Sequence, residues 1–131
     1  MLSSDVSAAY DPMFASAFEK RSSAFFGKGL VFNKFTGSRG KNGSNDANAE
    51  YLAEIRKVMD ESEVGYQYAE LGKVDVGGGG TIAYIMAQYG MDVIDSGVAV
   101  LCMHALYEIS SKADVYEAVK GYKAFIEKIG C

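Results

Sequence analysis

Four consecutive glycines, residues 77–80, stand directly before a helical pattern and constrain this chain more than any other feature. Glycine loses more backbone freedom on folding than any other residue, so an ordered run of four is costly. The cost is offset only where a side chain would be in the way. Two explanations are therefore open: a ligand approaches the backbone at these glycines, or another strand packs very close to them.

The glycines follow a predicted strand over 65–71 and precede a predicted helix. This order can present backbone N–H groups to an anion or a carbonyl oxygen. A nucleotide site is disfavoured, because no lysine precedes Thr81 and the dinucleotide-binding pattern is matched only by Gly77 and Gly79. A tight turn required by close packing stays open as the other reading.

The composition bounds the class of protein. The chain has 131 residues, 49% of them hydrophobic, and a formal net charge of −4, which indicates one globular domain with a real core. We expect no nucleic-acid partner, because the balance is mildly acidic. We expect no membrane span and no signal peptide, because no apolar run has the required length or flanks. With only Cys102 and Cys131 present, we expect reduced thiols and a cytoplasmic location.

Strand and helix patterns alternate along the chain. Strand patterns cover 2–9, 29–36, 65–71 and 91–100, with a bulge expected at Gly97. We expect the segments 13–26 and 37–45 to be loops, the first with one helical turn at most. The alternation of strands and helices predicts an α/β fold in which helices cover a parallel or mixed sheet.

Three helices follow from the spacing of apolar residues. The first begins after a cap at Asn45 or Asp46, the second follows the glycines and ends at Gly90, and the third begins at Ser111. Their expected apolar faces are Tyr51, Leu52, Ile55, Val58 and Met59; Ile82, Ile85, Met86 and Tyr89; and Val115, Val119, Tyr122, Phe125, Ile126 and Ile129.

The only histidine, His104, follows an apolar run at the end of a predicted strand, where sites in α/β proteins form. Cys102 lies two residues earlier and could face the same side of that strand, so the pair could supply two zinc ligands. A zinc site needs three or four ligands. The candidate carboxylates are Asp5, Asp75, Asp92 and Asp95. For Asp92 and Asp95 we expect solvated surface positions.

Several stretches together resemble a known family. They are SSDVSAAYDP at 3–12, GKGLVFNKFTGSRGKNGSNDANAEY at 27–51, ELGKVDVGGGGTIAYIMAQYGMDVIDSGVAVLCMH at 70–104 and SKADVYEAVKGYKAFIE at 111–127. The chain is similar in these stretches to the C-terminal part of the catalytic domain of the aspartyl aminopeptidase and aminopeptidase I family. The resemblance implies a three-layer α/β/α sandwich, present here as residues 1–131 with a mixed sheet of about four strands and three main helices.

The resemblance also implies a site. In that family, two zinc ions act in removing N-terminal residues, often acidic ones, from peptides. Asp5 matches a zinc-ligand aspartate, and His104 matches the last zinc-ligand histidine. Lys34, or its neighbour Asn33, matches a substrate-contacting lysine, and Gly79 and Gly80 match the wall of the substrate pocket. Expected partners are a peptide substrate and either further copies of the chain or a complementary N-terminal segment.

The chain departs from the family pattern. The remaining zinc ligands and the catalytic glutamates have no match in it, and Leu106 stands where the family often has proline. No catalytic residue is therefore assigned within the chain, and we expect little or no activity from these 131 residues alone. The alternative is a non-catalytic α/β assembly or binding module that keeps the peptidase fold.

Overall fold

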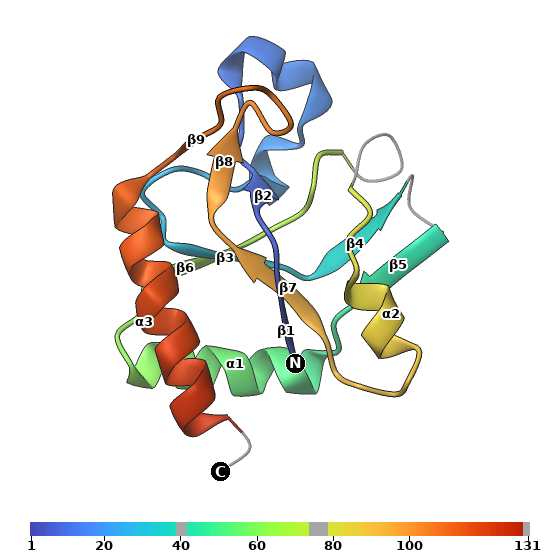
Figure 1. Cartoon of the computed structure of the whole chain (residues 1–131), viewed down its shortest axis with the longest axis vertical. Helices are drawn as coiled ribbons and strands as arrows, with labels where there is room; N and C mark the ends of the chain where they lie inside the picture. The colour runs from blue at the N-terminus through green and yellow to red at the C-terminus, as the bar shows by residue number, and fades with distance from the viewer. Residues whose placement is uncertain (39–41, 74–78, 130–131) are drawn as a thin grey trace.

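The central element is a four-stranded mixed sheet with the strand order β1-β7-β3-β6 (Figure 1). The strands are β1 (Leu2–Ser4), β7 (Ile94–Gly97), β3 (Leu30–Asn33) and β6 (Tyr66–Ala69). The pairs β1·β7 and β3·β6 are parallel, whereas β3·β7 is antiparallel. The structure, a computed structural model, describes residues 1–38, 42–73 and 79–129. The expected α/β fold with a mixed sheet of four strands is confirmed.

Two smaller sheets extend this core. Parallel pairing joins β2 (Ser7–Ala8) to β8 (Ala99–Leu101), and β8 pairs antiparallel with β9 (Ile109–Ser110). A separate antiparallel hairpin consists of β4 (Phe35–Ser38) and β5 (Asn42–Asp46). The prediction of a loop over 37–45 is therefore wrong. Its polar, glycine-rich composition is typical of a loop, but the segment belongs to a hairpin whose two strands pair with each other.

Three α-helices are present among the described residues: α1 (Ala49–Glu61), α2 (Ala83–Ala87) and α3 (Lys112–Lys128). None of the helices in the described part of the chain has the length and hydrophobicity needed to cross a membrane. The segment 13–26, which we expected to be a loop with one helical turn at most, contains two short 3₁₀ helices, η1 (Pro12–Ala17) and η2 (Lys20–Ser22).

The helix caps explain where α1 and α3 begin. Asn48 caps α1, because its side-chain oxygen accepts a hydrogen bond from the Tyr51 N–H at 2.7 Å. The cap therefore lies two residues beyond Asp46. Ser111 caps α3 as expected, with its hydroxyl accepting from the Asp114 N–H at 3.4 Å.

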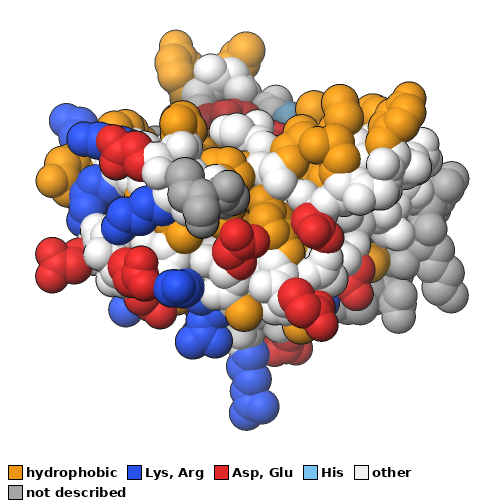
Figure 2. All heavy atoms as spheres, turned by 90° about the horizontal axis from the view of Figure 1, so that it is seen from below, with side chains coloured by type: hydrophobic (Ala, Val, Ile, Leu, Met, Phe, Trp, Pro, Cys, Tyr) orange, Lys and Arg blue, Asp and Glu red, His pale blue; other side chains and the backbone are white. Residues whose placement is uncertain are grey.

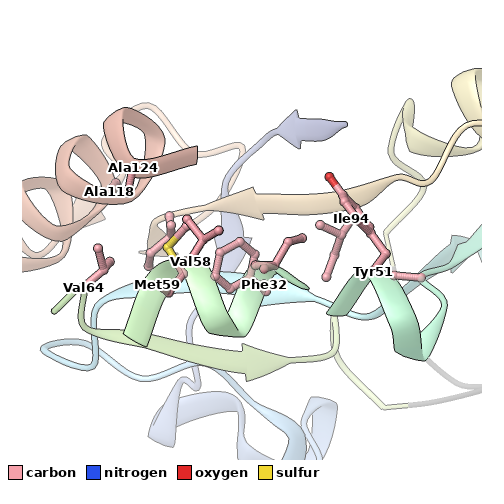
Figure 3. Close-up of a cluster of buried hydrophobic side chains, with 11 residues drawn as sticks. Phe32, Tyr51, Val58, Met59, Val64, Ile94, Ala118 and Ala124 are labelled. Carbon is pink, nitrogen blue, oxygen red and sulfur yellow. The ribbon is translucent and has the colours of Figure 1, made fainter. Parts of the chain in front are cut away.

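Helices α1 and α3 cover the same face of the central sheet and form the main core with it (Figure 3). Leu30 and Phe32 of β3 and Ile94 of β7 are completely buried there. The predicted face of α1 is confirmed, since Tyr51, Ile55, Val58 and Met59 are all buried and Leu52 packs against them. We call this face of the sheet the helical face.

The predicted face of α3 is partly wrong. Val119 and Ile126 are 64% and 78% exposed, and the side that meets the sheet carries Ala118, Gly121 and Ala124. A Cβ atom on Gly121 would lie 2.6 Å from the Leu30 side chain. Small residues therefore let α3 approach the sheet closely, and periodicity of large apolar residues does not detect such a contact.

The predicted face of α2 is also wrong. The helix is only five residues long, and Ala83 is its only buried residue. Ile82 and Tyr89 beside it are 66% and 79% exposed, and Ile85 and Met86 are exposed as well. Figure 2 shows hydrophobic side chains gathered on the side of the molecule where α2 lies. This apolar surface belongs to no core in the described residues.

Candidate functional site

The candidate site lies between the central sheet and the smaller sheet of β2, β8 and β9. Strand β1 pairs with β7 in the first sheet, and their continuations β2 and β8 pair in the second. We call the place where the chain passes from one sheet to the other, at Asp5 and Gly97, the crossing. The Asp5 N–H donates to the carbonyl oxygen of Ser96 at 3.1 Å. A Cβ atom on Gly97 would lie 1.8 Å from the Asp5 carbonyl oxygen, so only glycine allows this approach. Gly97 marks the crossing rather than the bulge that we expected.

The Asp5 side chain is exposed but held in place. Its Oδ1 accepts a hydrogen bond from the N–H of Val6 at 2.8 Å. The other carboxylate oxygen, Oδ2, forms no hydrogen bond within the described part of the chain and is available to a ligand. Asp5 lines a cavity of about 540 Å³ together with Gly79, Gly80 and His104.

His104 reaches the same cavity from the turn between β8 and β9. Strand β8 ends at Leu101, so the expectation that Cys102 and His104 face one side of a strand is wrong. Both residues have positive φ, 57° at Cys102 and 69° at His104. Such conformations cost about 1–3 kcal/mol each in a residue other than glycine and are concentrated at functional sites.

Glu108 fixes the backbone of this turn and was missed from the sequence. Its Oε1 accepts a hydrogen bond from the His104 N–H at 2.6 Å, and Glu108 also lines the cavity. The only sequence signal is a carboxylate four residues after the histidine, which is a weak one. The carboxylate of Glu108 thus anchors the main chain that carries the imidazole.

Gly79 and Gly80 form part of the wall of this cavity, and their contact with a substrate stays a prediction. A Cβ atom on Gly80 would meet nothing within 4 Å, and one on Gly79 would meet only the Leu71 side chain at 3.1 Å. Close packing of another strand therefore does not explain these two glycines. Gly77, Gly78 and the candidate carboxylate Asp75 lie outside the described residues.

Asp95 supports the wall from behind. It is 1% exposed, so the prediction of a solvated position is wrong. Its Oδ2 accepts hydrogen bonds from the hydroxyls of Thr36 and Thr81, both at 2.9 Å. Burial raises the pKa of Asp95, the two hydroxyls partly offset this, and the charge of Asp5 adds to the rise. Because Thr81 also lines the cavity, Asp95 connects the sheet to the wall.

Three further candidates are not among the residues that line this cavity. Asp92 is exposed as expected, and its carboxylate accepts a hydrogen bond from the Asn48 side chain. Lys34 is not among the residues that line the cavity; it forms an ion pair with Asp46 and lines a different one. Asn33 is buried and accepts a hydrogen bond from the Ser7 hydroxyl at 3.1 Å. The substrate contact of Lys34 stays a prediction.

The residues present can be compared with what zinc requires. A carboxylate oxygen from Asp5 and an imidazole nitrogen from His104 are both common zinc donors, and both line one cavity. Zinc normally takes four ligands, however, and no group of three or more His, Cys, Asp or Glu suited to a metal occurs among the described residues. The donor types fit zinc, whereas their number does not complete a site.

The chain is similar to known proteins over nearly its whole length. The model of the family described as "Aminopeptidase I zinc metalloprotease (M18)" matches residues 1–126. A probable M18 family aminopeptidase 1 from Clostridium acetobutylicum is 67% identical over 126 residues, covering 96% of this chain and 27% of the relative. Its namesake from Thermotoga maritima is 47% identical over 129 residues, covering 98% of this chain and 29% of the relative.

Solved structures agree in fold. The crystal structure of aminopeptidase I from Clostridium acetobutylicum matches with a TM-score of 0.92 and 66% identity, over 98% of this chain and 28% of that one. The M18 aminopeptidase of Thermotoga maritima matches with a TM-score of 0.93 and 48% identity, over 98% and 28% of the two chains. The chain therefore belongs to the M18 family of aminopeptidase I zinc metalloproteases.

Proposed function

We propose that this chain contributes two zinc ligands and one wall of the substrate pocket to a zinc-dependent aminopeptidase. The observation that carries the proposal is the meeting of Asp5, Gly79, Gly80 and His104 at one cavity, although they come from three distant parts of the sequence. Family resemblance assigns them related roles, and the cavity supports those roles by bringing them together. The substrate is the N-terminal residue of a peptide.

Each residue has a distinct task in this proposal. Asp5 and His104 hold zinc, which when bound can polarise a peptide carbonyl and lower the pKa of a water molecule. Glu108 and the N–H of Val6 orient the two ligands through the hydrogen bonds described above. The absence of side chains at Gly79 and Gly80 keeps the wall open for the substrate main chain.

The activity of a whole enzyme is part of the proposal, because the chain spans only 27–29% of the length of the first curated relatives. A preference for acidic N-terminal residues rests on the family resemblance alone. Assembly into homo-oligomers is supported by the exposed hydrophobic surface around α2, since large apolar patches commonly mark interfaces. A cytoplasmic location is supported by the free thiol of Cys102.

We further propose that a polypeptide of these 131 residues is inactive when it is isolated. Two ligands are too few to hold zinc tightly, and no catalytic carboxylate is assigned. The alternative function from the sequence, a non-catalytic module, is not favoured, because the family match extends over residues 1–126.

A complementation experiment tests the proposal. The isolated chain is mixed with the part of the Clostridium acetobutylicum relative that lies outside the matched region, and release of an N-terminal residue from an acidic peptide is measured. We expect chelator-sensitive release only from the mixture. The His104→Gln variant should abolish release, whereas Glu61→Gln, which removes an exposed carboxylate outside the cavity, should not. Release by the isolated chain, or by the His104→Gln mixture, would contradict the proposal.

A further inference from the structure

A second cavity, of about 500 Å³, lies on the helical face at the end of the central sheet. It is bounded by Lys34, which follows β3, by Glu70, which follows β6, and by Leu52 and Arg56 of α1. Strands β3 and β6 are parallel, so their carboxyl ends meet here. Ligands of open α/β sheets commonly bind at the carboxyl ends of strands. The cavity shares no lining residue with the zinc-ligand cavity.

Positive charge reaches this cavity from three elements. Arg21 comes from η2, Lys34 from the junction of β3 and β4, and Arg56 from α1. Lys34 is paired with Asp46, and the Tyr66 hydroxyl beside Arg56 raises the pKa of that guanidinium. For the Arg21 guanidinium, the described residues provide neither a hydrogen-bond acceptor nor an ion-pair partner.

The start of α1 adds to the positive potential. Ala49, the first residue of this 13-residue helix, lines the cavity. The N-terminal end of a helix carries a partial positive charge and free N–H groups. Glu70 is the only acidic residue of the lining, and burial raises the pKa of its carboxyl group. The lining thus holds three cationic side chains and the helix end against one carboxyl group, and Asp46 outside the lining offsets the charge of Lys34.

An independent observation is the hydroxyl of Tyr68. It is buried and has no hydrogen-bond partner, although Tyr68 lines the cavity. Buried polar atoms almost always have a partner, so an unpaired hydroxyl at a cavity indicates that something else accepts its hydrogen. Burial raises the pKa of Tyr68 to about 12, which keeps the hydroxyl protonated and able to donate.

Apart from Ser22, the remaining lining is apolar and small. Leu52, Ala53 and Ala69 contribute no hydrogen-bonding side chain and leave room for a compact apolar group. We propose that this cavity binds a small ligand with one carboxylate or phosphate group, held by Arg21 and Tyr68, and a compact apolar body against α1. This site goes beyond the proposed peptidase function, since it involves none of Asp5, Gly79, Gly80 and His104. Lys34, whose predicted substrate contact was given above, lines it but is paired with Asp46.

The test is an amide-resolved NMR titration of the 14.1 kDa chain. The probes are N-acetyl-L-leucine, which carries a carboxylate and an apolar body; N-acetyl-L-leucinamide, which has the same body without the charge; and inorganic phosphate. We expect saturable shifts at Arg21, Tyr68 and Ala69 with N-acetyl-L-leucine or phosphate, and binding of the uncharged amide at least about tenfold weaker. The better of the two anions identifies the source of the charged group.

Two variants and one control variant separate a specific site from general charge attraction. Arg21→Gln should weaken binding of the better anion about tenfold, whereas Lys57→Gln, which removes one exposed cation outside the cavity, should leave it unchanged. Tyr68→Phe should weaken binding several-fold without lowering the melting temperature of the free chain, because it removes only an unpaired hydroxyl. A purely structural tyrosine would not give this combination.

The proposal is overturned if neither anion produces saturable shifts at the cavity residues. It is equally overturned if Lys57→Gln weakens binding as much as Arg21→Gln, or if the uncharged amide binds as tightly as the carboxylate. None of these outcomes depends on zinc or on peptide hydrolysis, so the result is independent of the proposed function.

Discussion

On the helical face of the central sheet, Leu30, Phe32 and Ile94 are completely buried beneath α1 and α3; on the opposite face, Asn33 and Asp95 are just as deeply buried. Asn33 and Asp95 are opposite each other in the register of β3 and β7, and Ser3 of β1 is opposite Asp95 on the other side. We call this second surface the polar face. Two equally buried faces of one sheet therefore differ in chemistry: the polar face carries a buried carboxylate and amide, beside a small apolar cluster that includes Val31 and Ala69.

The difference in buried side chains indicates that the two faces have different roles, one in stability and one in building the candidate site. Burying a large apolar side chain stabilises the fold by about 1.5–3 kcal/mol, whereas a buried carboxylate is costly even when it is hydrogen-bonded. The helical face supplies stability. On the polar face, Asp95 lowers that stability by its burial, but its hydrogen bond holds Thr81 and the glycine wall beside Asp5. The predictions below test this division, starting with the largest effect.

Gly97→Ala tests the crossing at which the site is built. The new Cβ would lie 1.8 Å from the Asp5 carbonyl oxygen and 2.6 Å from its carbonyl carbon, and backbone atoms cannot yield cheaply. We expect a loss of more than about 4 kcal/mol, or no folding, measured by chemical unfolding followed by circular dichroism.

Gly80→Ala is the matched control, because its Cβ would meet nothing within 4 Å. We expect a change within about 1 kcal/mol. If Gly97→Ala unfolds at the same denaturant concentration as the original chain, the crossing is not the tight contact described above.

Phe32→Ala tests the helical face. Phe32 is completely buried and lies within 5.9 Å, centroid to centroid, of the rings of both Tyr66 and Tyr68. Truncation should destabilise the chain by about 3–5 kcal/mol in urea unfolding. Ile126→Ala is the control on α3, where the side chain is 78% exposed, and should change the stability by less than about 0.5 kcal/mol. Equal losses in the two variants would argue against the assigned core.

Asp95→Asn tests the polar face through pH. Because burial raises the folded-state pKa of Asp95, its contribution to stability is greatest below the unfolded value and is lost as pH rises through the folded value. Asparagine cannot titrate, so the stability of the variant relative to the original chain should increase as the pH rises from about 3 to 7. Unfolding free energies measured across that range check this, and a constant difference would contradict it.

Tyr122→Phe should have the smallest effect. The Tyr122 hydroxyl donates to the Ser96 carbonyl oxygen at 2.9 Å and lies 3.0 Å from the Ser4 hydroxyl, so it connects α3 to β7 and β1. Losing one such hydrogen bond at a half-buried position should cost about 1 kcal/mol, measured by thermal unfolding. A loss as large as that of Phe32→Ala would mean that hydrogen bonds, not apolar burial, hold the helical face.

The helical face was predictable where its residues are large. Tyr51, Ile55 and Val58 recur at helical spacing, and α1 was identified from them. The corresponding side of α3 was not, because Ala118 and Gly121 give little hydrophobic signal. Their burial depends on how closely the helix approaches Leu30, which is a long-range packing property.

The polar face was less predictable. Asp95 lies within the predicted strand 91–100, and we expected a solvated position because carboxylates are rarely buried. Its hydrogen-bond partners, Thr36 and Thr81, are distant in the chain. The residue pattern made His104 a candidate zinc ligand and Asp5 a candidate carboxylate, but only the family resemblance joined them in one site. Local patterns cannot show that they meet, since this depends on the shared crossing of β1–β2 and β7–β8.

The most direct test of the central claim is the zinc content of the complemented assembly, measured by atomic absorption after dialysis. The account predicts that zinc is retained by the mixture of this chain with the unmatched part of its Clostridium acetobutylicum relative, and that Asp5→Asn or His104→Gln lowers the zinc content while Glu61→Gln does not. Retention of the same zinc content by the Asp5→Asn and His104→Gln mixtures would contradict it.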